Sequence, residues 1–332
     1  MLVGVYHINM LQAIVIGLIQ GLTELFPISS LGHTVLIPSW LGGSWATLVR
    51  QEASAESPYL AFIVGLHLAT AVALLGFYIR EWIRLICGLF RSIVRRRIET
   101  DAERFAWLIV IATIPVGILG LVFEHQFRVL FAKPLAAAIF LMINGANLLA
   151  GEVYRRRVQL TREVASADGY VGDEVNERTT EDARPSLKRL RDNRIVPMDR
   201  QAEHELSRIG VVSSFVIGLS QSLALLAGIS REGVAMVGGL FRGLSNENAL
   251  RFSFMLSTPV IFAAGLLKVP DLLGHLGNGI RGEVIAGSAA ALITSLFAVI
   301  FLTRYFKTRT LIPFAVYSLA FGLASAIRFG IF

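Results

Sequence analysis

Two short polar clusters interrupt long apolar stretches of this chain and contain residue types that handle protons and phosphate. The first cluster holds Gln20, Glu24, Ser29, Ser30 and His33. Because Gln20 and Glu24 are four residues apart, they share one face of a helix. Serine is a nucleophile or a helix cap, and histidine titrates near neutral pH. Each residue alone has a structural explanation, but their proximity favours a functional site.

The second cluster consists of Ser230, Arg231 and Glu232. The planar guanidinium of an arginine binds a carboxylate or a phosphate through paired hydrogen bonds. Glu24 is the partner that we expect for Arg231 when no substrate is bound. Helix N-termini also favour anions, so the two clusters together predict a phosphate pocket. The sequence contains neither a nucleotide-binding glycine loop nor a Cys/His cluster with zinc spacing.

The elements that must position these clusters are membrane helices. Hydrophobic residues make up 54% of the chain, and several apolar stretches reach the roughly 20 residues that a helix needs to cross a bilayer. No Lys or Arg occurs before residue 10, so we expect no signal peptide. Spanning helices are predicted near residues 59–80, 105–123, 134–153, 250–268, 283–303 and 311–330.

Two further apolar segments, residues 10–41 and 209–241, are interrupted near their middles. The first is broken around Pro27 and the second around Gly228. Proline and glycine break helices, and proline also disfavours the helical conformation of the residue before it. We therefore interpret each segment as a re-entrant hairpin of two half-helices.

The two interrupted segments are related by an internal repeat. Residues 15–22 match residues 216–223 at six of eight positions with a constant offset of 201. The same offset pairs Ser29 with Ser230. The repeat predicts a duplication, in which residues 1–154 and 207–332 each contain one hairpin and three spans. The polar residues 155–206 between them are interpreted as a partly disordered loop.

Charge placement orients the repeats. Lys and Arg crowd three loops, at 80–104, 155–206 and 304–309, and are sparse in the others. This asymmetry predicts that the rich loops are cytoplasmic, and it explains the net charge of +7 without nucleic acid as a partner. The two hairpins then enter from opposite sides. The predicted fold is an all-α polytopic membrane protein with an inverted-topology repeat, six transmembrane helices and two re-entrant hairpins. In such folds the binding site lies near the membrane midplane.

The two clusters also resemble the signatures of a known family, the undecaprenyl-diphosphatases of the bacitracin-resistance type. Residues 20–33 resemble its first signature, and residues 227–233 with 238–240 and 251–254 resemble its second. Further similarity occurs at residues 114–123 and 312–317, so that the resemblance spans almost the whole chain except 155–206.

This resemblance implies an activity and a location. Members of the family hydrolyse undecaprenyl diphosphate to the monophosphate, which recycles the lipid carrier for peptidoglycan synthesis. They require a divalent cation such as Mg²⁺ or Ca²⁺. The implied location is the bacterial inner membrane, with the site open to the extracytoplasmic side; whether the chain forms a homodimer stays open. The family's functional residues fall on Gln20, Glu24, Ser30, His33, Ser230 and Arg231.

The second signature departs from the family pattern at three positions. Ala227 replaces a proline, Glu232 replaces a serine, and Ala235 replaces a threonine. Two hydroxyl groups are lost and one carboxylate is gained. We expect Glu232, together with Glu24, to bind the cation through oxygen ligands. A salt bridge between Glu232 and a nearby arginine is the alternative.

The expected mechanism is phosphoryl transfer from the terminal phosphate. Arg231 and the half-helix amides, with Gln20, Ser29, Ser230 and Glu232 nearby, are expected to bind the substrate. Glu24 would ligate the cation or accept a proton, Ser30 would attack or orient water, and His33 would shuttle the proton. Two other classes stay open: a polyprenyl-phosphate transporter or flippase, and a catalytically degenerate paralogue that binds lipid phosphate.

Overall fold

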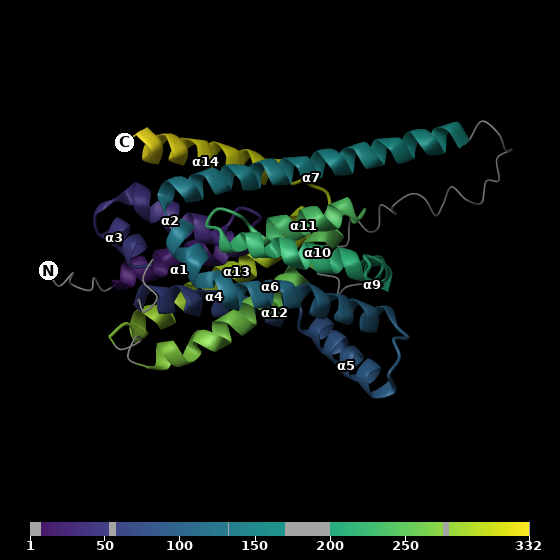
Figure 1. The fold of residues 1–332 in the computed structure, drawn as a ribbon, viewed down its shortest axis with the longest axis horizontal. Helices are drawn as coiled ribbons and strands as arrows, with labels where there is room; N and C mark the ends of the chain where they lie inside the picture. The colour runs from purple at the N-terminus through teal and green to yellow at the C-terminus, as the bar shows by residue number, and fades with distance from the viewer. Residues whose placement is uncertain (1–7, 53–57, 132, 170–199, 275–278, 332) are drawn as a thin grey trace.

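The computed structural model describes residues 8–52, 58–131, 133–169, 200–274 and 279–331, and within these ranges the regular elements are helices (Figure 1). Five helices are long and apolar enough to cross a membrane. They are α6 (Asp101–Phe131), α7 (Pro134–Gly169), α12 (Asn246–Leu273), α13 (Arg281–Tyr305) and α14 (Ile312–Ile331). A sixth predicted span is α4 (Pro58–Phe77), which passes the same test together with the helix that follows it. The chain is thus an all-α polytopic membrane protein.

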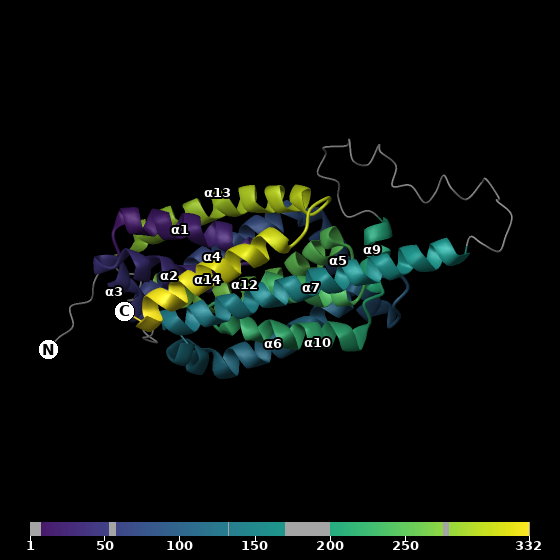
Figure 2. The ribbon, with the colours of Figure 1, turned by 90° about the horizontal axis from the view of Figure 1, so that it is seen from above.

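Both predicted hairpins are present. The first consists of α1 (Met10–Leu25) and α2 (Ser30–Leu41), and the second of α10 (Val211–Gln221), the 3₁₀ turn η1 (Ser222–Leu225) and α11 (Arg231–Phe241). Figure 2 shows α1 beginning at the end of the bundle near the N-terminus, whereas α10 begins at the opposite end, toward which α9 (Arg200–Ser207) also lies. The hairpins therefore open at opposite ends of the bundle, as an inverted arrangement requires.

The helices of the two halves pack reciprocally. Helix α1 lies against α13 of the second half, and α10 lies against α6 of the first, while α4 pairs with α12 and α7 with α14. Small residues allow the first two contacts: Gly17 abuts the backbone of Gly287, and Gly218 abuts the backbone of Ala112. Close backbone approach at small residues is the usual means by which helices associate in membranes.

Two of the predicted polar loops contain helix. Helix α5 (Ile79–Arg95) follows α4 with a bend of 84°, and its apolar side chains Ile83, Phe90 and Val94 remain exposed. A basic, amphipathic helix at a right angle to a span is typical of the membrane interface. Helix α7 continues to Gly169, so the segment predicted to begin as a loop at residue 155 begins as helix. Residues 170–199 of that segment lie outside the described ranges.

Candidate active site

The two helix breaks meet directly. Ser29 caps α2, and its Oγ accepts a hydrogen bond from the Gly32 amide at 3.2 Å. The same Oγ accepts a second bond from the amide of Gly228, in the other break, at 3.1 Å. Gly228 has φ +113°, and a Cβ there would collide with the backbone of α7, so only glycine fits the contact. The predicted meeting of the breaks is therefore confirmed.

A third helix ties the breaks together through Asn144 of α7. Its Nδ2 donates to the Pro27 carbonyl at 2.9 Å, and its Oδ1 accepts from the Ser230 amide at 3.0 Å. Asn144 is fully buried. The sequence prediction missed this residue, although a polar side chain within an apolar span was a visible signal.

Glu24 is the centre of the first half-site, and it is 4% exposed. Its Oε2 accepts from Gln20 Nε2 at 3.0 Å and from the Ser30 hydroxyl. The Nε2 atom of His67 lies 3.4 Å from the same oxygen. His67 comes from α4 and was not predicted, because its span showed no break or cluster. Glu24, Gln20 and Ser30 thus converge as expected, with an unexpected imidazole beside them.

The contacts of His33 differ from those that we expect of a proton shuttle for Ser30. Its Nδ1 is 2.6 Å from the Ser29 carbonyl oxygen, which only accepts, so this nitrogen carries the proton. Its Nε2 is 2.8 Å from the Tyr317 hydroxyl, and the ring stacks on Tyr317 and Phe321. The described contacts of His33 therefore hold the break against α14.

The second half-site contains polar groups without partners. Ser230 caps α11 by accepting from the Gly233 amide at 3.1 Å. The Nε and Nη1 atoms of Arg231 are buried and have no hydrogen-bond partner. Glu232 is 2% exposed, and its Oε1 also lacks a partner; the hydroxyl of Ser257 lies beside this carboxyl group.

The expected pairing of Arg231 with Glu24 is not observed. Within the described ranges Glu24 pairs with His67, and no ion pair within 4 Å joins Arg231 to either Glu24 or Glu232. The Arg231 charge nevertheless acts on Glu24, His67 and Glu232 at longer range, which places all four groups in one electrostatic cluster. The guanidinium is therefore available for an anionic ligand.

The donor chemistry of this cluster suits a hard cation, although the protein alone supplies few ligands. Oxygen atoms of Gln20 and Glu232 are buried without a partner, and the amide nitrogen of Gln20 donates to Glu24. Oxygen donors are those that Mg²⁺ and Ca²⁺ prefer. No group of three His, Cys, Asp or Glu side chains able to hold a metal occurs in the described part of the chain.

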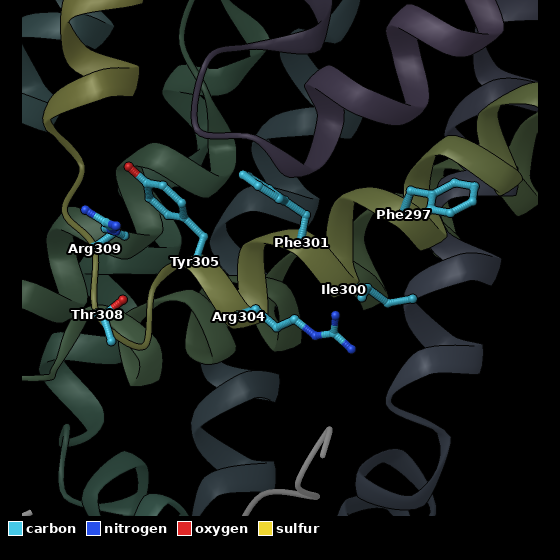
Figure 3. A pocket seen from close by; sticks show the side chains of 7 residues that line it. All are labelled: Phe297, Ile300, Phe301, Arg304, Tyr305, Thr308 and Arg309. Atoms are coloured by element: carbon cyan, nitrogen blue, oxygen red, sulfur yellow. The ribbon is translucent and has the colours of Figure 1, made fainter. Parts of the chain in front are cut away.

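A separate cavity of about 450 Å³ lies at the end of α13 (Figure 3). Its lining residues are Phe297, Ile300, Phe301, Arg304, Tyr305, Thr308 and Arg309. One of its lining residues, Phe301, stacks on Phe26 of the first break with ring centroids 5.8 Å apart. None of the predicted site residues lines it, so we distinguish this cavity from the candidate active site.

Comparison with known proteins shows the family of this chain. Residues 13–324 match the model of the family described as bacitracin resistance protein BacA. The chain belongs to the BacA family. Its relatives include "Undecaprenyl-diphosphatase 2" of Frankia alni, which is 51% identical over 98% of this chain and 99% of that protein.

Other BacA relatives cover the chain equally well. "Undecaprenyl-diphosphatase" of Mycolicibacterium paratuberculosis is 49% identical over 97% of both chains. "Undecaprenyl-diphosphatase 2" of Chromobacterium violaceum is 36% identical over 96% of this chain and 98% of that protein. The resemblance expected from the two polar clusters is confirmed over nearly the full length.

Proposed function

We propose that this BacA-family enzyme hydrolyses undecaprenyl diphosphate to undecaprenyl phosphate and inorganic phosphate. The observation that carries the proposal is the guanidinium of Arg231, which has two buried nitrogens without partners at the N-terminus of α11. A helix N-terminus and an arginine both favour a phosphate group. Family membership and the names of the relatives support the choice of substrate.

We assign the nucleophile to Ser30 and the base to Glu24. The Ser30 hydroxyl donates to Glu24 Oε2, which is the arrangement of an activated nucleophile. Ser30 Oγ attacks the terminal phosphorus, its proton passes to Glu24, and the bond from that phosphorus to the bridging oxygen breaks. Undecaprenyl phosphate leaves, and water then releases the phosphate from Ser30. Arg231 and the α11 amides stabilise the charge that develops on the transferred phosphoryl group.

A divalent cation, Mg²⁺ or Ca²⁺, is part of this proposal. Glu24 and Glu232 would hold it, with the unpartnered Gln20 oxygen as a further donor. When bound, the cation neutralises negative charge on the diphosphate. Magnesium sites commonly combine one or two carboxylates with phosphate oxygens, so two protein carboxylates are sufficient. Ser29 and Ser230 contribute by capping the half-helices whose amides face the phosphate.

We further propose that the protein lies in the bacterial inner membrane with its site open to the extracytoplasmic side. The basic residues of α5 and of the turn after α13 support this orientation, since the loops of membrane proteins that are rich in Lys and Arg lie on the cytoplasmic side. The carrier alternative is not favoured. Hydrogen bonds from Gly228 to Ser29 and through Asn144 fasten the two breaks to each other, whereas alternating access needs them to separate.

Phosphate release from undecaprenyl diphosphate by the purified protein tests this function. We expect release in Mg²⁺, loss of release in EDTA and recovery when Mg²⁺ or Ca²⁺ is restored. The blank is Arg231→Ala, because this change removes the group that binds the transferred phosphate. Release by the native protein that does not exceed the Arg231→Ala blank would favour a carrier or a degenerate lipid-phosphate-binding protein.

A further inference from the structure

We propose that Asn144 is a positioning residue that holds the two half-sites of the enzyme in register. The inference rests on the proposed function, because it concerns how Ser30 and Arg231 come to face one phosphate. Neither cluster contains Asn144, which lies on the unbroken helix α7. Its role follows from contacts with both breaks at once.

The two hydrogen bonds of Asn144 end beside the reacting groups. Its Nδ2 donates at 2.9 Å to the carbonyl of Pro27, three residues before Ser30. Its Oδ1 accepts at 3.0 Å from the amide of Ser230, the residue before Arg231. One rigid side-chain amide therefore connects the backbone of the proposed nucleophile to the backbone of the proposed phosphate-binding arginine.

The α7 residues one and two turns before Asn144 and one turn after it are apolar. Ala137, Leu141 and Leu148 are fully buried and pack around the breaks. A Cβ on Gly228 would meet Ala137 and Leu141, and a Cβ on Gly233 would meet the Asn144 oxygen at 3.2 Å. A polar residue between apolar turns of a helix is a known means of fixing register at a cost in stability.

Asparagine is suited to this position because its short amide both donates and accepts. Leucine has a similar volume but offers neither group, which would leave the Pro27 carbonyl and the Ser230 amide unpaired in a buried place. An unpaired buried group favours movement toward another partner. We therefore expect loss of Asn144 to let the two half-sites shift, while each keeps its own cap, Ser29 or Ser230.

Asn147 provides a matched control. It is the same residue type three positions later on α7, it is partly buried, and its Nδ2 has no hydrogen-bond partner. Asn144→Leu and Asn147→Leu therefore remove identical chemistry from the same helix. Only the first removes a connection between the breaks.

The experiment measures phosphate release and backbone hydrogen exchange for both variants of the full chain in detergent. For Asn144→Leu we expect kcat to fall about 100-fold, the order of loss for a misplacement near 1 Å. Exchange should accelerate in residues 26–33 and 226–233 but stay unchanged in α13 and α14. Asn147→Leu should match the native protein in both measurements. If Asn144→Leu does not fold, Asn144→Ser, which can serve one partner only, is measured by the same criteria with an intermediate loss expected.

Two results would overturn the inference. One is a kcat for the Asn144 variant within two-fold of that of Asn147→Leu. The other is accelerated exchange throughout the bundle, because that pattern reports general destabilisation rather than lost register. Failure of the proposed function is distinguishable: the native protein would then release no phosphate, while the exchange comparison would still test the connection between the breaks.

Discussion

The two helix breaks occupy equivalent places in the repeat but differ in how their polar side chains are satisfied. In the first break, Glu24 accepts from Gln20 and Ser30 and contacts His67, so the carboxylate is held in place. In the second break, Arg231 and Glu232 have buried atoms without partners. Both breaks retain the capping serine that the repeat places at equivalent positions, Ser29 and Ser230.

This difference indicates a division of labour between the halves. A carboxylate that accepts several hydrogen bonds is held in one position, and a general base beside a nucleophile needs such a fixed position. Buried groups without partners carry a desolvation cost that a ligand can relieve. Each break supplies a serine cap and a half-helix. We propose that the side chains then give the first half the nucleophile and base and the second half most of the groups that bind the phosphate.

The largest effect is expected at the first break. Glu24→Gln removes the base while preserving side-chain size, so kcat should fall about 10³-fold, within the usual range for lost acid–base catalysis. Initial rates of phosphate release at saturating substrate measure this change. Glu99→Gln, at an exposed carboxylate in the turn after α5, is the control and should retain native rates. If kcat falls by less than ten-fold in Glu24→Gln, Glu24 is not the base.

A smaller effect, on the cation, is expected at the second break. Glu232→Gln keeps an oxygen donor but removes its charge, so affinity for Mn²⁺ as a Mg²⁺ substitute should weaken about ten-fold. Electron paramagnetic resonance of free Mn²⁺ measures the affinity without turnover. Glu247→Gln, at a carboxylate paired with Arg251 at 2.8 Å, is the control. Unchanged affinity and unchanged metal dependence of activity in Glu232→Gln would assign Glu232 another role.

The smallest effect concerns the glutamines that the repeat places at equivalent positions. Gln20 donates to Glu24, whereas Gln221 is buried with neither amide atom paired. Gln221→Leu removes buried polar atoms that lack partners, so the thermal midpoint should rise by about 2 °C with native activity. Thermal unfolding in detergent measures this shift. A loss of activity in Gln221→Leu would instead place Gln221 in the binding site and weaken the contrast between the breaks.

Much of this architecture was predictable from the sequence because apolar length and helix breakers act locally. The six spans and both breaks were predicted near their observed positions, as was the convergence of Gln20, Glu24 and Ser30. The constant offset paired Ser29 with Ser230, and in the structure both serines cap half-helices. These features depend on local backbone preference and on residues close together in the chain.

The features that sequence reasoning missed arise from packing between distant segments. His67 and Asn144 lie in unbroken helices, and only the fold brings them to Glu24 and to the two breaks. The expected ion pair of Arg231 with Glu24 is not observed, and the imidazole of His67 lies beside Glu24 instead. His33 was predicted from its position one turn into the second half-helix, but its orientation toward Tyr317 depends on where α14 packs.

The central claim is that the two breaks form one catalytic site. The direct test is a double-mutant cycle of phosphate release from undecaprenyl diphosphate, with Ser30→Ala, Arg231→Lys, which keeps the charge but loses the planar fork, and the double variant. Groups that act as a unit show strongly non-additive losses. We predict that the double variant is no slower than the slower single variant. Losses in kcat/KM that multiply would contradict a shared site and would show that the two halves act independently.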